Sequence, residues 1–211
     1  MTCSDFFQQG GKAGTVEIRT RITVVIKMAN VSQPFLTGIF GKLNFVHACS
    51  FNDNEELILW ATEYARKHGL KIHIHLAESE REDLDCKAAH GGLSPVEYLE
   101  ALGVLGPDVI AAHTLWLSEH DIELLGKYHV NCVHNINSNT KLASGYKFKW
   151  KELTDAGANV CLGTDGCASS NNLDMLETMK TTALFQKAWR KDPSALPLQT
   201  LMDMATVNGA K

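Results

Sequence analysis

The amino-acid sequence predicts an α/β fold in which helices surround a parallel β-sheet. Short apolar runs rich in β-branched residues alternate with longer segments whose apolar residues recur at helical spacing. The apolar runs are nearly continuous, which is typical of parallel strands that are buried on both faces. With 211 residues, 45% of them hydrophobic, the chain can form a substantial core. We expect residues 1–211 to form a single domain.

The expected elements alternate along the chain. Strands are expected at 21–26, 42–48, 71–76, 108–114, 130–135 and 158–164. Helices are expected at 55–68, 94–103, 118–128, 149–157, 173–190 and 197–208. Helix-start signals support three of these positions: Asn54 as an N-cap, Pro95 at a first helical position, and Ser118 with Asp121 as a partial capping box.

Five expected strands end in a side chain that could bind a metal or transfer a proton. These side chains belong to His47, His75, His113, His134 and Asp165. In a (β/α)8 barrel, functional groups come from the carboxyl ends of many different strands. A doubly wound sheet would gather them at one point and usually carries a glycine-rich phosphate loop, which we do not find. We therefore predict a (β/α)8 barrel of the TIM type.

Composition excludes several classes of partner. The net charge is −4 and no basic block is present, so we expect no nucleic-acid partner. The chain has no apolar run of membrane-spanning length and no signal-peptide pattern at Met1, so we expect no membrane partner and a cytoplasmic location. None of the six cysteines forms a C-x-x-C pair, which argues against a zinc ribbon and against cysteine-ligated zinc deaminases.

The segment "HIHLAESERE" holds the first candidates for chemistry. His75, at the end of a strand, can bind Zn²⁺ or Fe²⁺ through a neutral imidazole. Glu78, three residues later, can act on a metal-bound water as general base and then as general acid. His113 and Asp165 end two other strands and would complete a hydrolytic centre. Each residue alone also fits a core-edge histidine, a loop carboxylate or a turn aspartate.

Two further histidines are expected to have structural roles. His73 is expected to point away from His75, towards the barrel wall or the helices. His134 is followed by a polar stretch that suits either a polar ligand or a self-bonded loop, and the structural role is preferred. Ser79 to Glu82 are expected only to begin the next surface segment.

Five segments of the sequence resemble the amidohydrolase superfamily, in the branch of the methylthioadenosine/S-adenosylhomocysteine deaminases and chlorohydrolases. They are "HIHLAES", "AAHTLWLS", "HNINSNTKLASG", "CLGTDGCASSNNLDM" and "MATVNGAK", in the family's order. The resemblance implies that His75 and Asp165 bind a metal. It also implies that Glu78 shuttles protons, and that His113 and Asp165 are catalytic. Finally, it implies that His47, with Glu78 and Asp165, contacts the substrate. Ala48-Cys49 follow His47 where the family usually has Pro-Tyr.

One departure from the family limits the metal site. The family carries an H-x-H with two metal ligands at the end of strand 1. The only H-x-H here, His73 to His75, precedes the strand-5 signature. The resemblance therefore implies an incomplete barrel with strands 2–8, without strand 1 and without the family's β-sandwich domain. Since catalytic zinc sites normally have three protein ligands and a barrel without one strand exposes two sheet edges, weak metal binding, poor stability or completion by a partner chain is expected.

The function implied by the resemblance is metal-dependent deamination of an adenosine-type nucleoside by a metal-activated hydroxide. One divalent metal is expected, zinc in preference to iron. The expected partner is a small nucleoside-like substrate, and a homo-oligomer is left open. Two alternatives also stay open: a chlorohydrolase or guanine-type deaminase of the same superfamily, and a catalytically inactive truncated chain.

Overall fold

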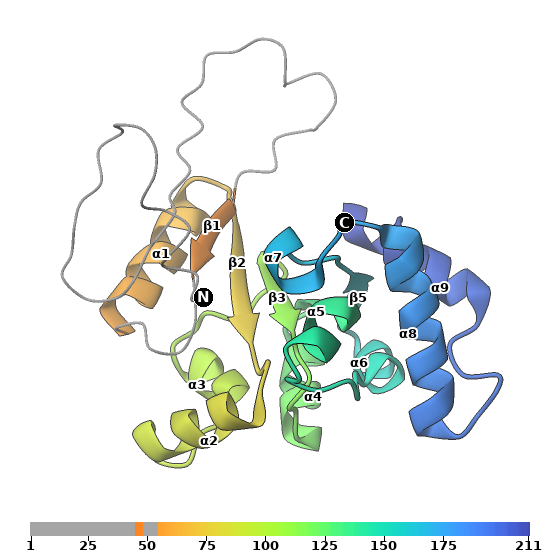
Figure 1. Cartoon of the computed structure of the whole chain (residues 1–211). Helices are drawn as coiled ribbons and strands as arrows, with labels where there is room; N and C mark the ends of the chain where they lie inside the picture. Colours follow the sequence, from red (N-terminus) through yellow and green to blue (C-terminus); the bar gives the residue numbers. More distant parts are fainter. Residues whose placement is uncertain (1–44, 49–54) are drawn as a thin grey trace, which may run out of the picture.

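The computed structural model describes residues 45–48 and 55–211, and its centre is a parallel β-sheet (Figure 1). The sheet has five strands in the order β1-β2-β3-β4-β5. They are β1 (Phe45–Ala48), β2 (Lys71–Leu76), β3 (Val109–His113), β4 (Asn131–His134) and β5 (Asn159–Leu162). All four pairings are parallel, which confirms the predicted α/β class with a parallel sheet. The sequential order lacks the reversal at which a doubly wound sheet binds its ligand.

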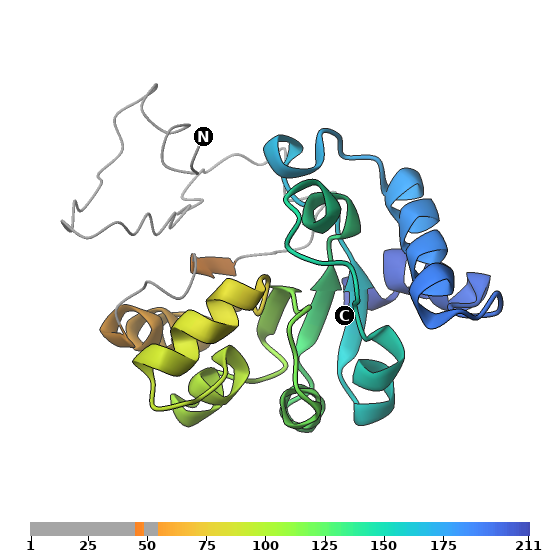
Figure 2. The ribbon, with the colours of Figure 1, turned by 60° about the horizontal axis from the view of Figure 1, so that its bottom comes forward.

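Helices occupy the connections and the two flanks of the sheet. They are α1 (Glu55–Lys67), α2 (Glu80–Ala89), α3 (Pro95–Ala101), α4 (Glu119–Lys127), α5 (Ile136–Lys141), α6 (Trp150–Ala156), α7 (Cys167–Ser170), α8 (Met175–Arg190) and α9 (Leu198–Ala205), with a 3₁₀ turn at Asn208–Ala210. Helix α1 lies on one flank, and α8 and α9 lie on the opposite flank, in both ribbon views (Figures 1 and 2).

Most predicted boundaries within the described residues hold to within a few positions. Two of the start signals are confirmed: Pro95 opens α3, and Ser118 and Asp121 form a complete capping box on α4. The third, Asn54 as an N-cap, lies outside the described residues. The expected strand at 21–26 lies outside the described residues. Helix α2 was not predicted, because its first turn is nearly all charged and few apolar residues mark a buried face. The short helices α5 and α7 were also missed, inside stretches treated as loops.

The strand β2 separates its apolar residues from its histidines. Ile72, Ile74 and Leu76 are buried in the hydrophobic core, whereas His73 and His75 alternate with them and are half-buried. The expectation that His73 faces away from His75 is wrong, because residues two apart in a strand point to the same face. Their ring centroids are 6.2 Å apart in an edge-to-face arrangement.

Helices α4 and α6 approach each other closely at Gly126. A Cβ at this position would lie 2.2 Å from the Ala156 carbonyl oxygen, so only glycine fits. Helix α6 also packs against β5. In the apolar core, Cys132 and Cys161 are buried free thiols, as small hydrophobic residues often are. No helix in the described ranges is long and apolar enough to cross a membrane.

Candidate active site

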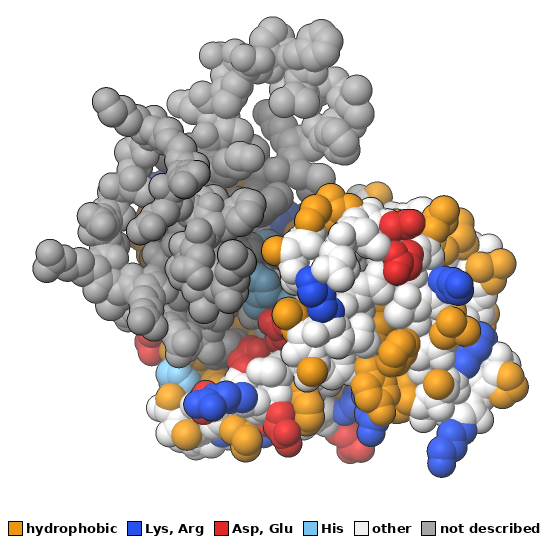
Figure 3. Space-filling model, in the orientation of Figure 1, with side chains coloured by type: hydrophobic (Ala, Val, Ile, Leu, Met, Phe, Trp, Pro, Cys, Tyr) orange, Lys and Arg blue, Asp and Glu red, His pale blue; other side chains and the backbone are white. Residues whose placement is uncertain are grey.

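Four of the predicted site residues come together beyond the carboxyl ends of the strands. The His75 ring, from β2, stacks on the His113 ring, from β3, with centroids 5.2 Å apart. Glu78 Oε2 lies 3.7 Å from His113 Nε2. The charge of Asp165, just after β5, acts on all three of these groups. Histidine and acidic side chains gather near one another on this face of the molecule (Figure 3).

The fifth predicted residue, His47, belongs to β1. In the sheet register it is the partner of His73. Its side chain lies outside the described residues, so its expected contact with substrate stays a prediction.

The backbone at these strand ends is unusual. Ala77, His113, Thr114 and Asp165 have positive φ angles of 52°, 79°, 44° and 60°. Side-chain-bearing residues rarely adopt this region, at a cost of roughly 1–3 kcal/mol each, and such residues cluster at functional sites. Gly163 permits the turn before Asp165, since a Cβ there would lie 2.4 Å from Asn135 Oδ1.

The loop that carries Glu78 is held by Glu82, which sequence reasoning missed. The two Glu82 carboxylate oxygens accept hydrogen bonds from the backbone N–H groups of Ala77, at 2.8 Å, and Glu78, at 2.7 Å. The Ser79 hydroxyl accepts from the Glu82 N–H at 3.2 Å and caps α2. The signal was present in the sequence, because Ser-x-x-Glu before a helix is the pattern of a capping box.

The surroundings of Glu78 suit proton transfer near neutral pH. Burial, followed by the negative charges of Glu82 and Asp165, raises the pKa of the Glu78 carboxyl to about 7, and a hydrogen bond from Ser144 partly offsets the rise. The side chain is still 25% exposed. A carboxyl group with this pKa can accept and release a proton near pH 7.

The surroundings of the two histidines favour neutral rings. Burial lowers the pKa of His75, and the charge of Asp165 only partly offsets this. Burial, followed by the charge of His75, lowers the pKa of His113 to about 4. Both rings therefore offer a nitrogen lone pair at neutral pH.

The surroundings of Asp165 favour the ionised carboxylate. Burial alone would raise its pKa, but the nearby Ser138 hydroxyl, the Gly166 N–H, the charge of His113 and the Ser169 hydroxyl together outweigh burial and hold the pKa below the usual value. The Gly166 N–H donates to Asp165 Oδ1 at 2.6 Å. Asp165 is therefore an anionic oxygen donor at neutral pH.

His75 and Asp165 are chemically suited to a divalent metal, since a neutral imidazole nitrogen and a carboxylate oxygen are both common zinc ligands. Within residues 45–48 and 55–211, however, no three histidine, cysteine or acidic side chains converge into a metal-binding group. The described residues thus offer two candidate ligands, whereas a catalytic zinc site normally has three protein ligands.

The polar segment after β4 contributes to the site, although we expected a structural role for it. Asn139, on α5, donates from Nδ2 to His113 Nδ1 at 2.8 Å and to Ser144 Oγ at 3.2 Å. The Trp116 indole N–H in turn donates to the Ser144 carbonyl oxygen at 2.7 Å. The segment from Asn139 to Ser144 therefore contacts both His113, through Asn139, and Glu78, through Ser144.

His134 is a packed residue of the core. It is fully buried, and its ring stacks on Phe148 with centroids 4.3 Å apart. Burial, followed by the charge of His113, lowers its pKa to about 3, so the ring is neutral. Neither ring nitrogen has a hydrogen-bond partner in the described part of the chain.

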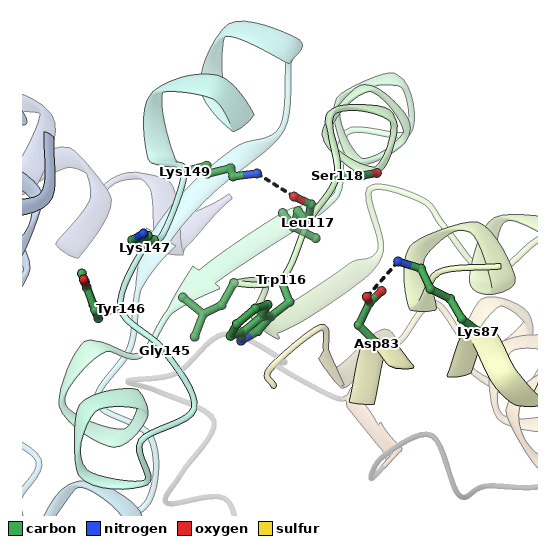
Figure 4. Close-up of a pocket in the computed structure, with 10 residues that line it drawn as sticks. Asp83, Lys87, Trp116, Leu117, Ser118, Gly145, Tyr146, Lys147 and Lys149 are labelled. Atoms are coloured by element: carbon green, nitrogen blue, oxygen red, sulfur yellow. Dashed lines mark hydrogen bonds and ion pairs between the residues drawn. The ribbon is translucent and has the colours of Figure 1, made fainter. Parts of the chain in front are cut away.

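A cavity of about 590 Å³ lies beside the site, between α2 and the loops that follow β3 and α5 (Figure 4). Trp116, Tyr146 and Lys147 are among its lining residues, and none of the predicted site residues lines it. Two of its charged groups are already paired: Lys87 Nζ contacts Asp83 at 2.8 Å, and Lys149 Nζ donates to the Leu117 carbonyl oxygen at 2.6 Å. Through Trp116, the cavity wall is joined to Ser144.

The sequence matches the amidohydrolase family over residues 12–211, and the chain belongs to this family. It is 53% identical over 158 residues to a 5'-deoxyadenosine deaminase of Methanosarcina barkeri. The matched region covers 75% of this chain and 36% of the relative. It is 42% identical over 197 residues to a 5-methylthioadenosine/S-adenosylhomocysteine deaminase of Thermococcus sibiricus. This second match covers 93% of the chain and 45% of the relative.

A solved structure agrees with these relatives. The fold is similar to a crystal structure of an adenosine deaminase from Xanthomonas campestris with bound zinc, with a TM-score of 0.73 and 34% sequence identity. That similarity covers 79% of this chain and 37% of the other. The chain thus spans less than half the length of each of these three proteins.

Proposed function

We propose that this chain carries the proton-transfer half of the active site of a metal-dependent aminohydrolase acting on an adenosine-type nucleoside. One observation carries the proposal: Glu78 lies 3.7 Å from His113 Nε2 and has a pKa of about 7, beyond the carboxyl end of a parallel strand. A group of this acidity, held next to a neutral histidine, suits a reaction that needs a base and then an acid.

The fold expected of such an enzyme is a (β/α)8 barrel. The five sequential parallel strands would be part of it, and residues 1–211 would form one partial barrel domain. The position of the functional groups at the carboxyl ends of β2, β3 and β5 supports this architecture, because barrel enzymes place their active sites at that end.

His75 and Asp165 would hold one divalent metal, zinc in preference to iron. The neutral imidazole and the ionised carboxylate support this assignment, as does the zinc in the related adenosine deaminase structure. When bound, the metal would supply Lewis-acid activation of the attacking water. The remaining protein ligands would come from outside the described residues or from a second chain, since three are normal for catalytic zinc.

The other steps fall to residues of this chain. The ionised Glu78 takes a proton from the attacking water and passes it to the ring nitrogen beside the reacting carbon. It then takes the second proton from the oxygen that has added to the carbon and gives it to the amino group, which leaves as ammonia while that oxygen becomes the carbonyl oxygen of the product. The carbon exchanges a C–N bond for a C–O bond, so nucleoside and water give an inosine-type product and ammonia. His113 stabilises the negative charge that develops on the attacking oxygen. Asp165 and His47 help to orient the substrate.

The substrate class follows from the relatives. Their names specify 5'-deoxyadenosine and 5-methylthioadenosine or S-adenosylhomocysteine. All three compounds are adenosines altered at the 5' position. We therefore propose an adenosine-type nucleoside rather than guanine or a chlorinated ring.

The test is an ammonia-release assay on the purified chain after loading with zinc. The substrates are 5'-deoxyadenosine, methylthioadenosine, S-adenosylhomocysteine and guanine, and the control variant is Glu78→Gln. We expect an inosine-type product that the variant forms at least about 10²-fold more slowly, because it lacks the acid/base group. If the metal-loaded chain deaminates only guanine, the protein is a guanine-type deaminase. If the metal-loaded chain gives no product from any substrate, the chain is inactive.

A further inference from the structure

Asn139 is the only link between His113 and Ser144 among the hydrogen bonds of the described residues. Its side chain is fully buried on α5. Asn139 Nδ2 lies 2.8 Å from His113 Nδ1 and 3.2 Å from Ser144 Oγ. His113 itself is 1% exposed, so water does not compete for its Nδ1.

The hydrogen bonds fix which end of the Asn139 amide faces His113. The Ser144 hydroxyl hydrogen has two acceptors within reach, the Glu78 carboxylate and, at 3.4 Å, the backbone carbonyl oxygen of Asn139, so the hydroxyl lone pairs are left to accept from Asn139 Nδ2. Asn139 Oδ1 is buried without a partner in the described part of the chain. Turning the amide round would instead bury two unpaired N–H donors, and orphaned donors are rarer in proteins than under-satisfied acceptors.

An amide N–H directed at His113 Nδ1 determines the tautomer of the ring. Nδ1 must keep its lone pair in order to accept this hydrogen bond, so the single hydrogen of the neutral imidazole sits on Nε2. Nε2 is the nitrogen on the side of Glu78, 3.7 Å from its carboxyl oxygen.

We propose that Asn139 is a positioning residue that locks His113 in its Nε2–H tautomer and so presents an N–H donor to the reacting atoms. A donor at this position stabilises a developing negative charge on the attacking oxygen, whereas a lone pair would repel it. The effect of Asn139 on catalysis rests on the proposed function, whereas the assignment of the His113 tautomer does not depend on it.

The primary test is ¹⁵N NMR of the metal-free full chain with labelled histidine, because the nitrogen shifts and couplings report which ring nitrogen carries hydrogen. The His113 signals are assigned by their loss in His113→Gln. In the unaltered chain we expect the hydrogen on Nε2. A hydrogen on Nδ1 of His113 overturns the proposal without any need for an Asn139 variant to fold.

Two variants sharpen the test. In Asn139→Asp the carboxylate can only accept, so the hydrogen should move to Nδ1 of His113. The matched control is Asn137→Asp on the same helix, because Asn137 Nδ2 donates to Thr178 Oγ1 at 3.3 Å, away from His113. We expect the control to keep the Nε2–H tautomer. If Asn139→Asp also keeps it, Asn139 does not set the tautomer.

The kinetic readout separates this inference from the proposed function. With the zinc-loaded chain and 5'-deoxyadenosine, we expect Asn139→Asp to lower kcat about 10²-fold with little change in KM, the size of effect seen when one charge-stabilising donor is lost. A tautomer change in a chain that deaminates no substrate would contradict the proposed function alone. An active chain whose kcat is insensitive to Asn139→Asp would contradict the positioning role.

Discussion

At the scale of single residues, the site is defined by shifted acidities. Glu78 is a carboxyl group kept partly protonated near neutral pH, whereas burial keeps His75 and His113 neutral and hydrogen bonds help to keep Asp165 ionised. Acid/base catalysis often uses neighbouring groups whose surroundings shift their pKa values in opposite directions. The sequence was sufficient to predict that these residues lie together, because each stands at or just after the end of an apolar strand. It could not predict their acidities, which depend on neighbours from other strands.

Glu78→Gln should stabilise the metal-free chain at pH 8. The pKa of this carboxyl is about 7 in the fold, above the ordinary 4.5. The folded state therefore keeps a proton that the unfolded state releases between these values, and stability is lost as the pH rises through about 7. Glutamine removes this loss, so we expect a gain of up to about 3 kcal/mol at pH 8 and none at pH 4.

Urea unfolding at the two pH values measures this gain. The exposed Glu80, on the first turn of α2, provides the matched control as Glu80→Gln. An equal effect of Glu78→Gln at both pH values would show that the carboxyl is not held protonated by the fold.

At the scale of elements, α2 and α5 do more than fill connections. The first turn of α2 supplies Glu82, which fixes the backbone beneath Glu78, and α5 supplies Asn139, which contacts His113. Neither helix was predicted. Their sequences are short or mostly polar, so they lack the apolar periodicity on which helix prediction depends. The strands and the long helices were predictable because their buried apolar residues recur at the spacing typical of each element.

Glu82→Ala should weaken both the fold and the acid/base group. Two backbone N–H groups lose their acceptor, which we expect to cost about 1–3 kcal/mol in the free energy of unfolding. The pKa of Glu78 should fall, because the charge of Glu82 is one of the causes that raise it. Chemical unfolding and a pH titration of Glu78 by NMR measure the two effects. The exposed Glu80→Ala should change neither, and a Glu78 pKa unmoved by Glu82→Ala would be evidence against this coupling.

Gly126→Ala should destabilise the packing of α4 on α6. The added methyl group meets the Ala156 carbonyl oxygen and cannot be accommodated without a shift of backbone. Overpacking of this kind typically costs about 1–3 kcal/mol. Thermal unfolding is the measurement. Gly209→Ala, where an added Cβ has no neighbour within 4 Å, is the control. Equal melting temperatures for the two variants would mean that the helices separate at little cost.

At the scale of the whole molecule, the described residues would form one side of the proposed metal centre. The fold class and four of the proposed site residues could be predicted from sequence, because strand ends in a parallel sheet converge on one edge. The supporting residues could not. Asn139 and Ser144 are distant in sequence from the groups they contact, and only the tertiary structure brings them together.

Zinc should bind the isolated chain weakly and through two side chains. At a zinc concentration tenfold above the dissociation constant, we expect a stabilisation of about 1.4 kcal/mol. His75→Ala and Asp165→Asn should each abolish it, because each removes half of the donor set. The exposed His120→Ala should retain it. The melting temperature with and without zinc is the measurement, and a shift that survives both ligand substitutions would place the zinc elsewhere.

The left-handed backbone at His113, Thr114 and Asp165 has a consequence for evolution. Residues in this conformation destabilise the folded state, and the same conformation sets the direction of the side chains that are proposed to react. Substitutions selected for thermal resistance at these positions would relax the turns and misdirect the side chains. Gains in robustness should therefore accumulate elsewhere, on the outer helices, while these strand ends stay fixed in any lineage that keeps the activity.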